Sequence, residues 1–223
     1  NKESNARDLL GNVVLARPEI VESQALWGNV LLNAGSNEEL IRWHEQLPDG
    51  ADAYPKIWNV RGRWAEKNGD RHAAIRCFLE AVRRNPNDRF ANKQLAAALG
   101  SIDEQLADRF SRRTKQLLDY LVVVNAVLAE PQDVEPMQQA AKLTESMGRL
   151  WEAWAWCRKA LELQPKLNWA QRDMRRLESI LTMKTPQTLS SANPVHDVDL
   201  SRWPPPNWIN ATVLNRSESD ASV

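Results

Sequence analysis

The chain has 223 residues, and its 29 Lys and Arg residues balance its 29 Asp and Glu residues to give a formal net charge of zero. A neutral chain lacks the broad positive field that nucleic-acid binding normally requires, so we expect no nucleic acid among its partners. The most apolar stretch, Leu117 to Leu128, contains Asp119 and Asn125, and a membrane span needs about 18 to 20 apolar residues, so we expect a soluble protein without membrane insertion.

The first predicted element is a single helix from about Asn5 to Ala16. The chain begins at Asn1 rather than Met and has no charged segment followed by an apolar one. We therefore expect it to be a processed or excised piece of a longer protein.

Glycines recur at a fixed spacing in the next part of the chain. Gly28 and Gly62 are 34 residues apart, and so are Gly35 and Gly69. A fixed internal period of about 20 to 50 residues indicates a repeat architecture. Gly35 and Gly69 suit the left-handed conformation that ends many helices, and Ser36 with Glu39 has the spacing of a helix-capping pair.

The segment from Trp58 to Pro86 carries the strongest signature. Its sequence, WNVRGRWAEKNGDRHAAIRCFLEAVRRNP, resembles the tetratricopeptide repeat family at Trp58, Gly62, Gly69, Ala74, Phe78, Ala81 and Pro86. Small residues at two of these positions, Gly62 and Ala74, allow two helices to cross closely. The resemblance implies an all-α fold, a right-handed α-α superhelical solenoid of antiparallel helix pairs.

The same frame extends over most of residues 5 to 182. It places repeats from about Val21, Pro55, Arg89, Val134 and Asn168. The fourth repeat restates the signature with Gly148, Ala153, Cys157, Ala160 and Pro165. The sequence also departs from the family pattern, because Arg61 and Ala65 replace the usual leucine and tyrosine.

The third repeat is longer than the others. The third and fourth repeats start 45 residues apart instead of 34, which leaves 11 extra residues between Arg89 and Asp133. Eleven residues make about three helical turns, so they lengthen a helix without rotating its apolar face. We predict one long helix from about Asp103 to Ala129.

The composition changes from Lys184 onward to Pro, Ser, Asn and Thr. We therefore divide the chain into a helical repeat domain, residues 1–183, and an extended C-terminal arm or linker, residues 184–223. Trp203 and Trp208 flank a run of prolines and are predicted to dock either on the groove of this chain or on a neighbouring domain. The arm is similar to segments that join tetratricopeptide arrays to integrin-like propeller repeats in some exported bacterial proteins, which implies a periplasmic or extracellular location.

Most of the ten tryptophans are expected in the core. Helix faces that pack within or between repeats contain Trp27, Trp58, Trp64 and Trp154. The spacing leaves four others open between core and surface: Trp43, Trp151, Trp156 and Trp169.

The family resemblance implies a concave groove lined by the first helix of each repeat. The positions that contact ligand in the family correspond here to Asn29, Asn33, Lys56, Asn59, Arg63, Lys67, Phe90, Lys93, Lys142, Trp169, Arg172 and Arg176. This set leans basic, although Glu22 and Glu135 also fall in the pattern, so we expect a protein or peptide partner with acidic segments. A merely solvated face is the alternative. In the family, a set of lysines and asparagines called the carboxylate clamp binds chaperones. This set is incomplete here, because Ala25, Val60 and Gln94 stand at key positions, so we do not expect a chaperone adaptor of that type.

No catalytic motif stands out. The histidines at 44, 72 and 196 lie far apart, and Cys77 and Cys157 have no metal-type spacing, so we predict no metal, no cofactor and no enzyme activity. The predicted function is a scaffold for protein interactions through the groove and the arm. The alternative is a structural part of a larger assembly without a peptide-binding groove.

Overall fold

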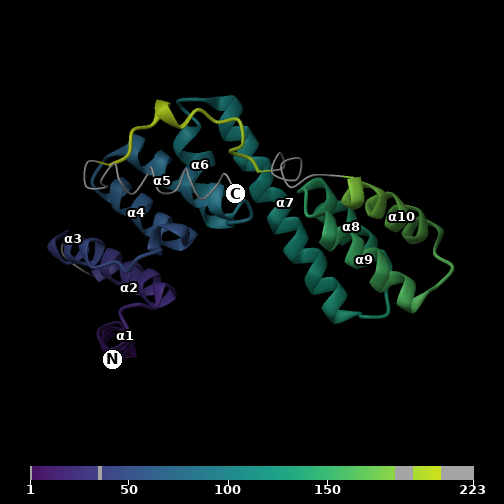
Figure 1. Ribbon diagram of the computed structural model, residues 1–223, viewed down its shortest axis with the longest axis horizontal. Coiled ribbons are helices and arrows are strands. Elements are labelled where there is room, and N and C mark those ends of the chain that lie inside the picture. The colour runs from purple at the N-terminus through teal and green to yellow at the C-terminus, as the bar shows by residue number, and fades with distance from the viewer. Residues whose placement is uncertain (1, 35–36, 184–192, 207–223) are drawn as a thin grey trace. The chain divides into compact units, whose positions relative to one another are not determined.

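The computed structural model describes residues 2–34, 37–183 and 193–206 (Figure 1). These residues are largely helical and contain no strand. The α-helices are α1 (Lys2–Ala16), α2 (Val21–Ala34), α3 (Asn37–Glu45), α4 (Pro55–Lys67), α5 (Arg71–Arg84), α6 (Arg89–Leu99), α7 (Glu104–Ala129), α8 (Glu135–Ser146), α9 (Leu150–Leu163) and α10 (Asn168–Met183). Two short 3-10 helices are η1 (Ala51–Ala53) and η2 (Leu200–Arg202).

The predicted helix starts agree closely with the structure. Four helices begin at the residues expected to open a repeat, namely Val21, Pro55, Arg89 and Asn168. Helix α8 begins one residue after the expected Val134, and α1 begins at Lys2 instead of Asn5. The long helix expected from Asp103 to Ala129 is confirmed as α7. The all-helical class is therefore confirmed, and neighbouring helices pack against one another.

The described residues form two compact units, which we treat separately. The first holds residues 2–34, 37–107 and 197–206, and the second holds residues 108–183 and 193–196. Helix α7 begins in the first unit and continues through the second. No described helix is long and apolar enough to cross a membrane.

In the first compact unit, aromatic rings fill the space beside glycines that the sequence places 34 residues apart. A Cβ atom on Gly28 would lie 2.6 Å from the Trp43 ring, and one on Gly62 would lie 2.5 Å from the Phe78 ring. Because real Cβ atoms do not approach this closely, α2 packs on α3 and α4 packs on α5 only with glycine at these positions. Trp43 therefore belongs to the core, an outcome that its spacing left open.

Aspartates begin three of the helices. The side chains of Asp70, Asp88 and Asp103 accept hydrogen bonds from the backbone N–H groups of Ala73, Ala91 and Leu106, at 2.9, 3.0 and 3.0 Å. These caps satisfy amides that have no partner within the helix. The sequence prediction placed Asp103 at the start of the long helix but missed the caps at Asp70 and Asp88. Gly69, just before α5, has φ of 77° as predicted, whereas Gly35 and Ser36 lie outside the described residues.

The second compact unit has a core of small and sulfur-containing residues from α7 to α10. It includes Val127, Met137, Ala153, Cys157, Ala160, Ala170 and Leu177. Trp154, Trp156 and Trp169 are half-buried against this core, so the core assignment of Trp154 holds in part. Trp151 is 64% exposed and packs edge-on against Trp154 with ring centroids 6.2 Å apart.

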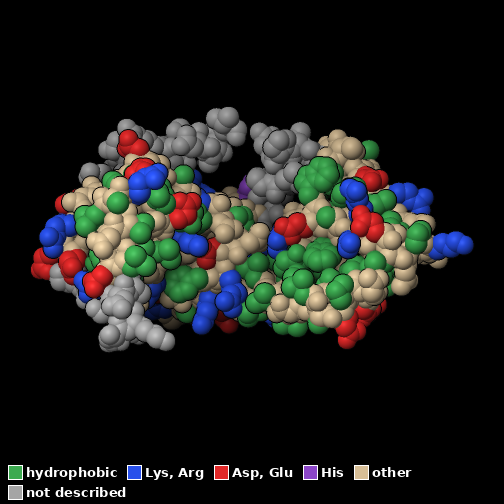
Figure 2. All heavy atoms as spheres, turned by 90° about the horizontal axis from the view of Figure 1, so that it is seen from below, with side chains coloured by type: hydrophobic (Ala, Val, Ile, Leu, Met, Phe, Trp, Pro, Cys, Tyr) green, Lys and Arg blue, Asp and Glu red, His purple; other side chains and the backbone are tan. Residues whose placement is uncertain are grey.

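Helix α7 is apolar on two faces within the second unit. Leu117, Val123 and Val127 are buried. The residues of a second stripe, Leu118, Leu121, Val122 and Leu128, are between 40% and 71% exposed. Their spacing of three, four and ten residues from Leu118 keeps them on one side of the helix. Figure 2 shows hydrophobic side chains gathered on a face of the unit that contains α8 to α10.

Candidate functional site

The side chains predicted for the groove of the first compact unit lie on α2, α4 and α6, and polar contacts join these helices. Arg63 of α4 donates from Nη1 to Asn29 Oδ1 at 2.7 Å and from Nη2 to Asn33 Oδ1 at 3.1 Å. Lys67 Nζ donates to the carbonyl oxygen of Leu32 at 3.2 Å. Helices α2 and α4 are therefore side by side, and Asn29 and Arg63, 34 residues apart in the sequence, are in contact. We call the surface formed by α2, α4 and α6 the first-helix surface.

Two further contacts join α4 to α6. Asn59 Nδ2 donates to Asp88 Oδ2 at 2.7 Å, and Gln94 Nε2 donates to Glu66 Oε2 at 3.3 Å. Asn59 is buried, so it positions the start of α6 instead of offering a free amide to a ligand. The predicted groove residue Asn59 thus contacts the protein itself.

The predicted groove residues exposed to solvent in the first unit include Lys56, Phe90 and Lys93. Lys56 and Lys93 are exposed and form no ion pair with a described residue. Phe90 is 40% exposed, and its ring meets Phe78 edge-on with centroids 6.1 Å apart. The first-helix surface therefore combines two free ammonium groups with one partly exposed aromatic ring.

Glu66 of α4 is an acid of the first-helix surface. Burial raises the pKa of the Glu66 carboxyl, an effect that outweighs the hydrogen bond from Gln94 and the charge of Arg63. A carboxyl with a raised pKa loses part of its negative charge as the pH falls. The Glu66 carboxyl is therefore protonated at a higher pH than an ordinary glutamate is.

Two of the four predicted groove residues in the second compact unit form ion pairs. Arg176 of α10 holds Glu145 of α8 with both of its terminal nitrogens, Nη2 at 2.7 Å from Oε2, and this hydrogen bonding raises the pKa of Arg176. Arg172 lies 3.1 Å from Asp173. Lys142 of α8 is exposed, and Trp169 packs against the core.

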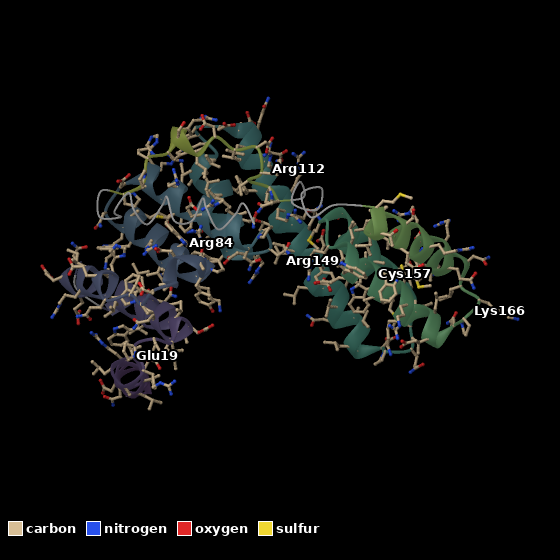
Figure 3. The ribbon with its side chains drawn as sticks, in the orientation of Figure 1. Glu19, Arg84, Arg112, Arg149, Cys157 and Lys166 are labelled. Atoms are coloured by element: carbon tan, nitrogen blue, oxygen red, sulfur yellow. The ribbon has the colours of Figure 1, made fainter. Side chains whose placement is uncertain are left out.

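A buried cluster of charges lies between η1, α4 and α5, and the sequence prediction did not find it. The Trp58 ring is held between the guanidinium groups of Arg61 and Arg84, at 4.6 and 4.7 Å from the ring, and its Nε1 donates to the carbonyl oxygen of Asp52 at 2.7 Å. Arg61 also pairs with the Asp52 carboxylate. Arg84 lies within the first unit (Figure 3). The one available signal was the departure of Arg61 from the leucine of the family pattern.

Glu80 balances the arginines of α5. Its carboxylate is 1% exposed and accepts from Arg76 at 3.1 Å, from Arg83 at 2.8 Å and from Arg84 at 2.6 Å. Burial by itself raises the pKa of Glu80, but the charges of Arg83, Arg84 and Arg76 outweigh it and bring the pKa below its usual value of 4.5. Glu80 is therefore ionised in the fold.

Trp203 of the predicted arm is buried within the first unit. Its side chain is 1% exposed, and its carbonyl oxygen accepts from Arg76 of α5 at 3.3 Å. In the tetratricopeptide pattern α5 is the second helix of a repeat, whereas the groove belongs to first helices. Trp203 therefore packs on its own chain beside α5, and Trp208 lies outside the described residues.

The two cysteines are core residues. Cys77 and Cys157 are both fully buried, the latter inside the second unit (Figure 3). Burial raises the pKa of Cys77 to about 12 and that of Cys157 to about 11. Their thiols therefore stay protonated, and a protonated thiol is a poor nucleophile.

No model of a known protein family matches the sequence, and no curated protein was found to match it. The resemblance to the tetratricopeptide family rests on the residues quoted above and stays a prediction.

Proposed function

We propose that the chain is a scaffold for protein interactions, built as a tetratricopeptide-like right-handed solenoid, and that its first-helix surface binds an acidic segment of a partner protein. The observation that carries the proposal is the contact of Arg63 with Asn29 and Asn33, because residues one repeat apart meet on one surface. The resemblance to the tetratricopeptide family implies that a ligand binds on a surface of this kind.

The chemistry of the exposed residues supports an acidic ligand. Lys56 and Lys93 offer free ammonium groups to carboxylates, and Phe90 offers an aromatic edge to an apolar side chain. Charge-assisted hydrogen bonds to carboxylates are stronger than neutral ones. A segment with acidic and apolar residues in alternation matches these features best.

The test uses a fluorescein-labelled peptide of alternating glutamate and leucine, with the corresponding lysine peptide as the control ligand. Fluorescence anisotropy should show binding of the glutamate peptide that weakens with added salt. Replacing Lys56→Glu and Lys93→Glu together should weaken binding by about tenfold or more. These lysines are preferable to Arg63 as targets, because Arg63 also joins α2 to α4.

The matched control is Arg112→Glu on α7, an exposed charge reversal on a second helix. It should leave the affinity unchanged, and circular dichroism should show equal helicity in all variants. Undiminished affinity of the variant with Lys56→Glu and Lys93→Glu would exclude the first-helix surface as the binding site for the glutamate peptide. Failure of wild type to bind the glutamate peptide would favour the alternative, a structural part of a larger assembly.

A further inference from the structure

Arg76 holds the segment of residues 197–206 on the first compact unit. Its guanidinium is largely buried, with 7% of the residue exposed. Its Nη1 donates to the carbonyl oxygen of Leu200 at 3.1 Å and to that of Trp203 at 3.3 Å. Both acceptors belong to the main chain. Arg76 therefore recognises the backbone at the two ends of η2 and not particular side chains.

The surroundings of Arg76 explain why it needs these carbonyl groups. Glu80 is shared by Arg76, Arg83 and Arg84, so one carboxylate faces three guanidinium groups. Each guanidinium has five N–H donors and no acceptor. A buried donor without a partner is costly, and the two main-chain carbonyl groups supply acceptors that Glu80 alone does not.

Side chains at positions 202 and 203 add sequence selectivity. Trp203 is almost fully buried. Arg202 lies over the Trp203 ring at 4.7 Å and pairs with Asp103 at 2.9 Å. Asp103 also caps α7 through its other carboxylate oxygen. The site thus has a place for a tryptophan and a charge that selects an arginine before it.

The bound segment has its own local structure. Asp199 Oδ1 accepts from the Ser201 backbone N–H at 2.9 Å and from the Ser201 hydroxyl at 2.7 Å, which forms the turn that leads into η2. Pro204, Pro205 and Pro206 follow, and proline restricts φ to a narrow range. A segment with few free dihedral angles loses little entropy when it binds.

We propose that this face of α5, with Arg76 and Asp103, is a peptide-binding site for a segment in which a short 3-10 turn ends in Arg-Trp and is followed by prolines. The chain's own residues 199–206 occupy the site. The same segment, supplied as a separate peptide, binds there when the internal copy is weakened. The site lies on α5 and does not depend on the first-helix surface or on its proposed acidic ligand.

The experiment uses the full chain with Arg202→Ala and Trp203→Ala, which weakens the internal segment. The probe is a fluorescein-labelled peptide of residues 197–206, and a scrambled peptide of the same composition is its control. Anisotropy should show that the variant binds the probe at least about tenfold more tightly than wild type does, because the tethered segment competes in wild type.

Two further substitutions, each added separately to that variant, test which side chains of the site hold the probe. Arg76→Lys should weaken probe binding by about tenfold, because an ammonium cannot reproduce the planar fork of Arg76. Asp103→Asn keeps an amide oxygen that can cap α7 but removes the charge. It should weaken binding of the probe, and it should have no effect on a probe that carries Arg202→Met.

Three results would overturn the proposal: no binding of the probe to the weakened variant, equal binding of the scrambled peptide, or full affinity with Arg76→Lys. If the double substitution lowers helicity, the single variant Arg202→Glu serves instead. It places a negative charge beside Asp103 and leaves Trp203 in the chain. The same tighter binding relative to wild type is expected, and its absence would contradict the proposal.

Discussion

Glu80 is a single buried carboxylate among three arginines, and its ionisation is therefore linked to the stability of the first unit. Its pKa in the fold is below the ordinary value of 4.5. A group with a lowered pKa contributes stability above its unfolded pKa and loses that contribution as the pH falls through the folded pKa. The free energy of unfolding should therefore fall as the solution is made more acidic than about pH 4.5.

Replacing Glu80→Gln should lower the free energy of unfolding at neutral pH by about 3 kcal/mol, because it leaves the buried Arg76 and the half-buried Arg83 and Arg84 without this counter-charge. It should also reduce the loss of stability in acid. Urea unfolding at neutral and acidic pH, followed by circular dichroism, measures both effects. The control Asp119→Asn removes an acid from an exposed pair with Lys115 and should change neither. An unaltered acid profile in Glu80→Gln would refute the linkage.

At the scale of the helix pair, the spacing of α4 and α5 depends on Gly62. A methyl group there would lie 2.5 Å from the Phe78 ring, so Gly62→Ala should lower the free energy of unfolding by about 1 to 3 kcal/mol through overpacking. Gly100 is the matched control. Its added Cβ would lie no closer than 3.5 Å to another group, and its backbone is in the right-handed helical region.

Gly100→Ala should be neutral or stabilise the protein by up to about 1 kcal/mol. Chemical denaturation of the two alanine variants beside wild type tests the contrast. Equal stability of Gly62→Ala and wild type would show that the Phe78 ring moves aside without cost. If Gly62→Ala does lower the free energy of unfolding, adding Phe78→Leu should restore part of that loss, since residues 62 and 78 are in contact.

The helices could be predicted from the sequence because their signals are local. Pro55 opens α4, Gly69 precedes α5 with positive φ, and an insertion of three turns extends α7. These features depend on backbone conformation and on helical periodicity, which neighbouring residues determine. The caps at Asp70 and Asp88 are also local, yet they were not predicted.

The parts that could not be predicted depend on residues far apart in the chain. Arg76 meets Leu200 and Trp203 more than 120 residues later, and no spacing rule predicts such a contact. The family frame placed Arg63 and Asn29 on one surface but did not predict the hydrogen bond between them. Likewise, helical periodicity places Trp151 and Trp154 on neighbouring faces of α9 but does not tell which face α10 covers.

At the scale of the whole molecule, two faces of the first unit have different chemistry. The first-helix surface is open and carries Lys56 and Lys93, whereas the α5 face is occupied by residues 199–206. Substitutions on one face leave the contacts of the other intact. The proposed acidic ligand and the proposed Arg-Trp peptide can therefore be tested separately in the same full chain.

The exposed stripe of α7 has a practical consequence for judging whether the protein is folded. Leu118, Leu121, Val122 and Leu128 give the native second unit an apolar surface, and fluorescent dyes such as ANS bind to exposed apolar surface. Native protein should therefore brighten ANS while its near-ultraviolet circular dichroism stays intact, and Leu121→Lys with Val122→Lys should abolish the signal. For this chain, dye fluorescence would report a feature of the intact fold and would be a misleading sign of a molten globule.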